Sequence, residues 1–293
     1  MFNIILKSNF FFPSYIKVKS LLNYSLRKLL AKLHLSPGEL RFNSSYHLGR
    51  LLGKGGYGNV YEGVRIRDGL KVAVKKIPKA KVAHMKDNLP LEVALLNQVD
   101  DIRGVVHIIE CIDMGDSFAI VFENDGVNKD LFDIILEKGK LNEDFARDVF
   151  QQVTRTIIMC HQRGVLHRDI KDENIIIDIK TLEVKLIDFG SGCLVQEGDY
   201  NEFEGTPIYA PPEWVKEKMY KAESMTVWQL GILLFDMVSG NLPFLEERDI
   251  LEGKLEWVVD LSAETRDLIE KCLCQDPRER IAMVDILKHP WFL

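Results

Sequence analysis

The sequence predicts an α+β protein with two lobes, a small β-rich N-terminal lobe and a larger helical C-terminal lobe. Residues 46–77 are rich in Val, Leu, Tyr and Gly and alternate as strands do, for example in the run KVAVK at 71–75. Beyond about residue 128, apolar residues recur at helical spacing, as at every fourth position from Phe145 to Ile157. A chain of 293 residues is long enough for two lobes that share a cleft.

The remaining elements follow from their local patterns. In chain order, these patterns predict a helix over residues 89–99, a strand over 117–123, a linker over 124–128, a long helix to about 161, short strands at 175–177 and 184–187, and helices at about 226–238, 263–273 and 283–289. The run TVWQLGILLFDMV at 226–238 is apolar on nearly every side. We therefore expect that helix to lie in the middle of the helical lobe.

Charge is distributed unevenly along the chain. Residues 1–38 contain six Lys or Arg and no acid, whereas the rest of the chain carries 32 basic and 44 acidic side chains. The excess of acidic side chains after residue 38 argues against nucleic-acid partners, because phosphates need basic patches on the protein. It favours cationic partners. The five cysteines include no Cys-x-x-Cys pair and are typical of reduced thiols in an intracellular protein. No run approaches the length of a transmembrane helix.

Residues 1–41 form a basic N-terminal extension. Its apolar runs are interrupted by Lys7, Pro13 and Lys17, which argues against a secretory signal. Residues 21–35 could form a basic amphipathic helix, which would suit a transit peptide or a membrane-surface anchor. The alternative that we favour is a disordered tail or a stretch of uncertain gene model, so a targeting role stays open.

A glycine-rich loop, GKGGYGNV at 53–60, lies between two predicted strands. Glycines let the backbone approach phosphates closely and point amide hydrogens at them. Because a strand and not a helix follows the loop, a dinucleotide-binding oxidoreductase is disfavoured. Lys75 on the next strand could hold two phosphates as a point charge. Glu92, in the following helix, could either hold Lys75 extended or be an exposed helical glutamate.

Two further motifs, HRDIKDEN at 167–174 and DFG at 188–190, carry groups suited to phosphoryl transfer. Asp169 can accept a proton from an attacking hydroxyl group. Asn174 offers a carbonyl oxygen and Asp188 a carboxylate, which are hard oxygen ligands of the kind that Mg²⁺ prefers. Any one of these residues could lie in a surface turn, but their shared order and spacing are not explained by chance.

In that order, the motifs resemble those of eukaryotic protein kinases from about Tyr46 to Phe292. The resemblance implies a two-lobed protein kinase fold over residues 42–293, with an N-lobe at 42–122, a hinge at 123–129 and a C-lobe at 130–293. It implies ATP and Mg²⁺ as cofactors. The residues that it implies for ATP binding are Leu52, Gly53, Gly55, Gly58, Val60, Ala73, Lys75, Glu92, Glu123 and Asp125.

The same resemblance implies roles for the later motifs. Asp169 is expected to be the catalytic base, and Lys171 to steady the transferred phosphoryl group, with Lys75 on the α- and β-phosphates. Asn174 and Asp188 are expected to hold Mg²⁺. A further pair, Glu213 and Arg280, resembles the structural ion pair that anchors the activation segment of these enzymes.

The runs LLGKGGYGNVYEG, LPLEVALL, HRDIKDENIIID, LIDFGSG and PPEW resemble those of the Pim family of serine/threonine kinases. Thr226 stands where most kinases carry Asp, which is the Pim pattern, and Lys171 occupies the position typical of serine/threonine kinases. At the hinge the sequence departs from Pim, because Asp125 replaces a proline and retains its N–H. We therefore expect two hinge hydrogen bonds to adenine. Phe122 is bulkier than the usual Leu and should narrow the back pocket.

The activation segment carries its own negative charge. Between Ser191 and Gly205 it has four carboxylates, no Lys or Arg, and no further Ser or Thr before Thr206, whose place is structural. Following the arrangement attributed to Pim kinases, we expect Glu202 or Glu204 to pair with Arg168 in place of a phosphate. This predicts a kinase that is active without activation-loop phosphorylation. The alternative is that these acids only solvate a mobile loop.

Acidic residues near the peptide groove of the family imply protein substrates with Arg or Lys before the target Ser or Thr. These residues are Asp130, Asp133, Asp172, Glu173 and Asp236. One family acid is replaced by Asn241, which could weaken selection at one subsite. We expect a monomeric serine/threonine kinase of the cytoplasm, the nucleus or both, and the alternative is a pseudokinase-type scaffold that binds nucleotide without catalysis.

Overall fold

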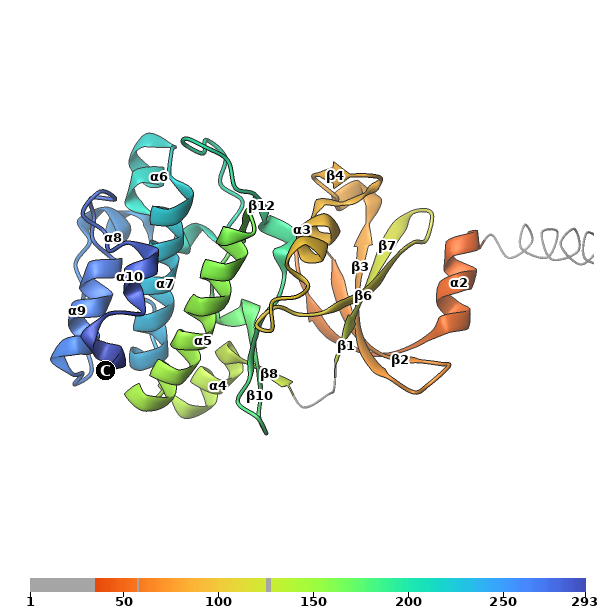
Figure 1. Ribbon diagram of the computed structural model, residues 1–293, viewed down its shortest axis with the longest axis horizontal. Coiled ribbons are helices and arrows are strands. Elements are labelled where there is room, and N and C mark those ends of the chain that lie inside the picture. The colour runs from red at the N-terminus through yellow and green to blue at the C-terminus, as the bar shows by residue number, and fades with distance from the viewer. Residues whose placement is uncertain (1–34, 57, 125–127) are drawn as a thin grey trace, which may run out of the picture.

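The computed structural model describes residues 35–56, 58–124 and 128–293, which form a small β-rich lobe and a larger helical lobe (Figure 1). This α+β, two-lobed architecture is the one that the sequence predicts. Two expectations lie outside the described residues: the hinge hydrogen bond of Asp125, and nearly all of the amphipathic helix expected at 21–35.

A five-stranded antiparallel sheet, ordered β1-β2-β3-β7-β6, forms most of the N-lobe. Its strands are β1 (Tyr46–Lys54), β2 (Asn59–Arg65), β3 (Lys71–Pro78), β6 (Ile108–Asp113) and β7 (Ser117–Glu123). Along β3, Val72 and Val74 pack in a small cluster on one face, while Ala73 and Ile77 join the main core on the other. Since side chains alternate along a strand, Lys75 faces the main core and the cleft between the lobes.

In the N-lobe, helix α3 (Leu91–Val99) packs against the face of the sheet that carries Lys75 (Figure 1). The two-residue strands β4 (Met85–Lys86) and β5 (Leu89–Pro90) form a hairpin just before it. The helix expected over 89–99 therefore begins two residues later, because Leu89 and Pro90 pair in the hairpin. Of its nine residues, Glu92 is the only acid, and it is buried with four apolar neighbours.

Helix α2 (Pro37–Ser45) lies at the outer end of the N-lobe (Figure 1). Ser36 and Glu39 form a reciprocal capping box, and Ser36 Oγ donates to the Met114 carbonyl oxygen at 2.6 Å. Phe42 is buried against the sheet. The domain start that we expected at residue 42 falls inside this helix, whose first turn the capping box closes.

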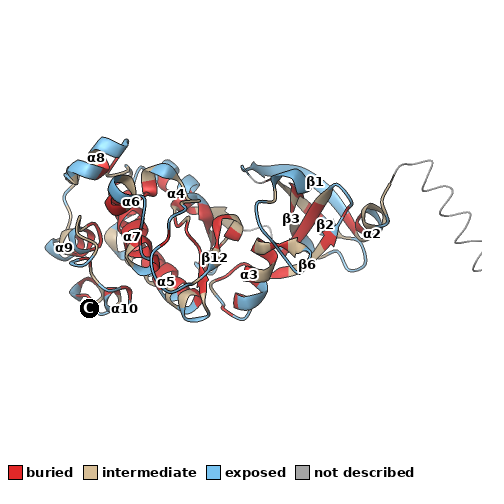
Figure 2. Ribbon diagram, turned by 90° about the horizontal axis from the view of Figure 1, so that it is seen from above, coloured by how far each residue is buried: buried red, intermediate tan, exposed pale blue. Residues whose placement is uncertain are grey.

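The C-lobe is built around α7 (Ala222–Ser239), in which every residue from Met225 to Ser239 is buried, as its apolar sequence predicts (Figure 2). The other C-lobe helices are α4 (Leu131–Lys138), α5 (Glu143–Gln162), α6 (Pro212–Glu217), α8 (Glu247–Glu252), α9 (Ala263–Cys272) and α10 (Met283–Ile286). α10 ends three residues before the expected 289. None of the described helices is long and apolar enough to cross a membrane.

Short strands at the lobe junction hold the loops that carry the motifs. Strands β8 (Asn128–Asp130), β10 (Ile175–Asp178) and β11 (Val184–Leu186) form one sheet, and β9 (Val165–Leu166) pairs with β12 (Cys193–Leu194). Residues 167–174 leave β9 and enter β10, while 187–192 leave β11 and enter β12, so the two motif loops lie side by side. Within the range 123–129 expected for the hinge, Glu123 ends β7 and Asn128 begins β8.

Candidate active site

The glycine-rich loop turns tightly between β1 and β2. The Gly55 N–H donates to the Gly58 carbonyl oxygen at 2.8 Å. A Cβ at Gly58 would lie only 2.2 Å from the Lys76 carbonyl oxygen, whereas one at Gly53 would meet nothing within 4 Å. Gly58 is thus required for the close approach of the loop to β3. Of the expected adenine-side residues, Leu52 is exposed at the end of β1, and Val60 and Ala73 are half-buried on the adjoining strands.

Lys75 lies between two carboxylates. Its Nζ donates to both Glu92 oxygens, at 2.7 and 2.8 Å, and to Asp188 Oδ1 at 2.7 Å. Burial alone would lower the pKa of Lys75, but the charges of Glu92 and Asp188 outweigh it and raise that pKa above its ordinary value. For the acid Asp188, burial acts in the opposite direction and would raise the pKa. The Lys75 ammonium outweighs it and holds the pKa of Asp188 below its ordinary value. Glu92 is buried and paired, so it is not an exposed helical glutamate.

The carboxylate of Asp169 is held by three neighbours. Its Oδ1 accepts from the Thr206 N–H at 2.8 Å and from Thr206 Oγ1 at 2.7 Å, and its Oδ2 accepts from Asn174 Nδ2 at 3.0 Å. Lys171 Nζ donates to Thr206 Oγ1 at 2.9 Å and lies 3.5 Å from Asp169 Oδ2. Burial would lower the pKa of Lys171, but the carboxylates of Glu173 and Asp169 raise it, so the lysine stays charged. The Asp169 carboxylate, the Lys171 ammonium and the Thr206 hydroxyl thus lie next to one another.

The residues expected to hold Mg²⁺ have the right donor atoms. The Asn174 side-chain nitrogen donates to the Asp169 backbone and carboxylate, which leaves its carbonyl oxygen as the group available to a metal. The Ile187 N–H donates to the backbone carbonyl oxygen of Asn174 at 2.9 Å, which places Asp188 beside Asn174 and leaves the Asn174 side-chain oxygen uninvolved in that bond. One amide and one carboxylate oxygen suit a hard cation. The donor set fits Mg²⁺.

Two buried side chains, His167 and Gln229, support the catalytic loop at residues 167–174. The His167 ring packs edge-on against Phe189 at 4.7 Å and lies 2.9 Å from the Ile187 carbonyl oxygen. Burial lowers the pKa of His167, which favours the neutral ring. Gln229 in α7 donates to the Arg168 carbonyl oxygen at 2.9 Å and accepts from the Ile170 N–H at 3.2 Å. Sequence reasoning gave Gln229 no role, although it is the one amide side chain of a largely apolar helix, which was a readable signal.

Arg168, the residue expected to pair with Glu202 or Glu204, lies beside the start of the activation segment. Arg168 is buried, has a positive φ of 68°, and donates through Nε to the Ser191 carbonyl oxygen at 2.5 Å. Its backbone geometry aims the side chain at the start of the segment, while the Glu202 side chain is exposed. That an acid of the segment replaces a phosphate on this arginine stays a prediction.

An aromatic cluster, defined as Tyr200, Phe203, Trp214 and Tyr220, anchors the segment. Phe203 stacks on Trp214 at 5.6 Å, Tyr220 meets Trp214 edge-on at 5.9 Å, and Tyr200 stacks on Tyr220 at 5.2 Å. Backbone bonds join Tyr200 and Tyr220 in both directions, and the Tyr220 hydroxyl donates to the Glu202 carbonyl oxygen at 2.9 Å. The segment is thus attached to the C-lobe by rings and backbone groups.

Behind the segment, Glu213 and Arg280 form a bidentate pair with two N–O distances of 3.0 Å. Arg280 also donates to the Ser224 and Cys274 carbonyl oxygens and lies over the Trp228 ring at 5.0 Å. Both charged side chains are buried. The pair therefore ties α6 to the chain beyond α9.

A groove of about 380 Å³ opens beside the catalytic loop, between α4, the turn Asp172–Asn174, residues 206–209 and residues 236–242. We call it the α4–α7 groove. Three of the five acids expected for substrate recognition, Asp172, Glu173 and Asp236, line it. Of the other two, Asp130 accepts from the Asp133 N–H at 2.7 Å and so caps α4, and Asp133 is exposed. Burial and the nearby Asp172 carboxylate raise the pKa of Asp236 to about 7, and burial also raises that of Asp172.

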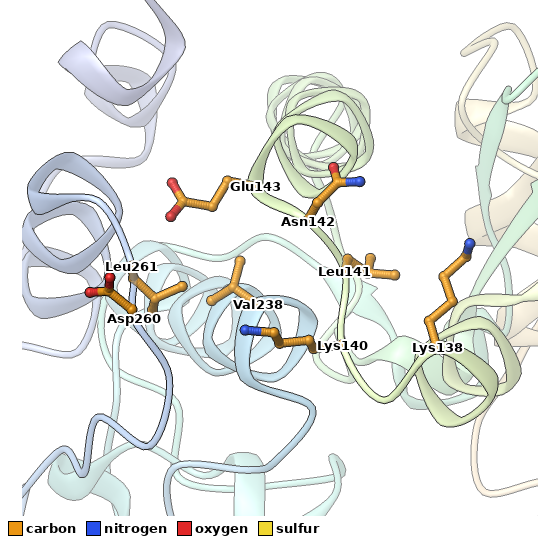
Figure 3. A pocket seen from close by; sticks show the side chains of 8 residues that line it. All are labelled: Lys138, Lys140, Leu141, Asn142, Glu143, Val238, Asp260 and Leu261. Atoms are coloured by element: carbon orange, nitrogen blue, oxygen red, sulfur yellow. The ribbon is translucent and has the colours of Figure 1, made fainter.

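A second pocket, of about 510 Å³, lies elsewhere in the C-lobe (Figure 3). It is formed by the loop between α4 and α5, the end of α7 and the segment before α9. Its lining mixes two lysines, two acids and short apolar side chains, and includes none of the residues around Asp169. The catalytic chemistry therefore lies outside it.

A protein kinase domain model matches residues 46–292. The chain is 41% identical over 270 residues to the serine/threonine-protein kinase pim-2 of Danio rerio, covering 87% of each chain. It is also 41% identical over 283 residues to the serine/threonine-protein kinase prk-2 of Caenorhabditis elegans, covering 94% of this chain and 64% of that protein. A more distant relative is the SNF1-related protein kinase catalytic subunit alpha KIN12 of Arabidopsis thaliana, 33% identical over 260 residues, covering 85% of this chain and 51% of that protein.

Proposed function

The chain belongs to the protein kinase family as an ATP-dependent serine/threonine kinase of the Pim type, and from this premise we propose that it needs no activation-loop phosphate and selects basic sites. In this proposal Asp169 accepts the proton of the substrate hydroxyl, and Lys171 neutralises charge on the transferred phosphoryl group. Lys75 orients the α- and β-phosphates of ATP while Glu92 holds it extended. Asn174 and Asp188 would hold Mg²⁺, which would supply charge neutralisation when bound.

The observation that carries the proposal of constitutive activity is the attachment of the activation segment through its own side chains. Thr206 is hydrogen-bonded to Asp169 and Lys171, and the aromatic cluster holds the segment on the C-lobe. The Lys75–Glu92 pair, which kinases require for activity, is closed. Burial of stacked rings supplies attraction that other kinases obtain from a phosphate on an arginine.

Protein stripped by phosphatase, and shown by mass spectrometry to carry no phosphate, is expected to phosphorylate an Arg-containing Ser peptide without a lag. The reason is that the arrangement of Lys75, Asp169 and Thr206 is complete in the unmodified chain. Asp188→Asn, which removes a carboxylate proposed to hold Mg²⁺, is the inactive control. Activity that appears only after phosphate returns would retain the kinase and overturn the constitutive proposal. Nucleotide binding with no transfer in either state would favour a scaffold.

Selection of basic sites is supported by the charge of the α4–α7 groove. Asp172 and Asp236 are both buried, and the neighbouring groups that bear on their charge are Glu173 and the neutral hydroxyl of Tyr209. Glu173 is already paired with Lys171 at 2.6 Å. A substrate guanidinium would therefore meet the Asp172–Asp236 pair as its main counter-charge.

The KM for an Arg-containing peptide is expected to fall about fivefold as the pH rises from 6 to 8. Because the pKa of Asp236 is raised to about 7, the Asp172–Asp236 pair carries one negative charge below that pH and two above it. Steady-state kinetics with the peptide varied would measure the change, and the KM for ATP serves as the internal control. Asp236→Asn should flatten the profile. A peptide KM with the same pH dependence in both proteins would contradict this explanation.

A further inference from the structure

The backbone around Asp169 is held by side chains, because residues 167–170 belong to no helix or strand. The Asp169 N–H donates to His167 Nδ1 at 3.3 Å, and the Asp169 carbonyl oxygen accepts from Asn174 Nδ2 at 2.8 Å. Both partners lie in the same loop as Asp169. Since the backbone sets where a short side chain can point, the direction of the Asp169 carboxylate depends on contacts of this kind.

Gln229 holds the two peptide groups that flank Asp169, and it does so from outside the loop. Its Nε2 donates to the Arg168 carbonyl oxygen at 2.9 Å, and its Oε1 accepts from the Ile170 N–H at 3.2 Å. The first of these groups belongs to the peptide bond before Asp169 and the second to the peptide bond after it. Gln229 lies in α7 and is 0% exposed, so the two hydrogen bonds join the Asp169 backbone to the core of the C-lobe.

The amide of Gln229 suits these two partners because it donates and accepts at once. The Arg168 carbonyl oxygen needs a donor and the Ile170 N–H needs an acceptor, whereas an ionised carboxylate could only accept. Thr226, one turn earlier in α7, cannot supply the donor, since its hydroxyl donates to the Ala222 carbonyl oxygen at 2.8 Å within the helix. The donor to the Arg168 carbonyl oxygen therefore comes from Gln229.

The Arg168 peptide is the part of the loop that most needs such support. Arg168 has a φ of 68°, a conformation that a non-glycine residue keeps only where its surroundings hold it. A Cβ at Gly205 would lie 2.4 Å from the Arg168 carbonyl oxygen, so that oxygen packs closely against the activation segment as well as Gln229. Without the amide, a buried carbonyl oxygen would lose its donor, and the strained peptide would be free to rotate.

We propose that Gln229 is a positioning residue for phosphoryl transfer, which sets the direction of the Asp169 carboxylate through the peptide groups on either side of it. The inference rests on the proposed role of Asp169 as the base and adds a residue of α7 to that machinery. Gln229 acts through Asp169 and touches neither the substrate hydroxyl nor ATP. Its contribution should therefore appear only where Asp169 accepts the proton.

Gln229→Met keeps the length of the side chain and removes both hydrogen bonds. It is expected to lower kcat for peptide phosphorylation roughly 10²-fold, the size of loss that a small misplacement of a catalytic group can cause. The KM values for ATP and for the peptide should change less than about twofold. A double-mutant cycle with Asp169→Asn, followed by single-turnover kinetics, decides the mechanism. In the Asp169→Asn background, Gln229→Met should lower the rate less than about threefold.

Met237→Ala is the matched control, because Met237 is as fully buried in α7 but lies eight residues beyond Gln229. It should lower Tm through the cavity that it leaves and keep kcat within about twofold of wild type. If Gln229→Met does not fold, Gln229→Asn, which keeps an amide but shortens its reach, takes its place in the cycle.

An equal fold loss from the Gln229 variant in both backgrounds would overturn the inference while the proposed function stands. A kcat loss no larger than that of Met237→Ala would do the same. A kcat near the wild-type value in Asp169→Asn alone would overturn the proposed role of Asp169 and the inference with it.

Discussion

Replacement of Asp169 by Asn is expected to lower kcat for peptide phosphorylation by about 10²- to 10⁴-fold, the range that general base catalysis supplies. The amide keeps the shape of the carboxylate and can still accept from the Thr206 N–H and hydroxyl, so the activation segment should remain attached. It cannot accept a proton from the substrate hydroxyl. The loss should therefore fall on kcat, with little change in the KM for ATP.

Single-turnover and steady-state kinetics would measure this effect, and thermal unfolding would confirm that the variant folds. Asp144→Asn provides a control, because Asp144 is an exposed carboxylate on α5, hydrogen-bonded to Arg147 three residues away. That variant should behave as wild type. A residual kcat above about a tenth of the wild-type value in Asp169→Asn would show that another group takes the proton.

Replacement of Arg280 by Met is expected to destabilise the protein by about 3–5 kcal/mol, because it leaves the buried Glu213 carboxylate without its counter-charge. Arg280 is only 1% exposed at its side chain, and its loss also leaves two carbonyl oxygens without their donor. For a chain of this size such a change corresponds to a fall in Tm of roughly 10 °C. Differential scanning calorimetry would measure it.

The matched control is two residues away. Arg278 is 84% exposed and pairs with Asp276 at 2.6 Å on the surface. Arg278→Met should therefore change Tm little, since exposed ion pairs contribute weakly to stability. Similar falls in Tm for the two variants would mean that burial of the Glu213–Arg280 pair is not what makes it important.

Fold, family and enzyme class were predictable from the sequence because they can be recognised from the order and spacing of a few motifs. The spacing of the glycine-rich loop, Lys75, the HRD motif and the DFG motif follows from strands and turns that are each readable locally. These predictions are confirmed by the two-lobed architecture and by the match to the protein kinase domain.

The contact of Arg168 with Ser191 could not be read in the same way. The direction of the Arg168 side chain is set by a positive φ in the catalytic loop and by the position of Ser191, which tertiary packing determines. The expected pairing of Arg168 with Glu202 or Glu204 stays a prediction. Helix α2, which contains residue 42, was not predicted either, although Ser36 and Glu39 have the spacing of a capping box that a reader of the sequence could have recognised.

The aromatic cluster gives the activation segment an unusual response to its surroundings. Where a segment is fastened by an ion pair, added salt screens the attraction and loosens it. Tyr200, Phe203, Trp214 and Tyr220 contact one another through apolar surface, which salt does not screen and which weakens on cooling. The part of the attachment that these rings supply should therefore tolerate large swings in ionic strength and weaken in the cold.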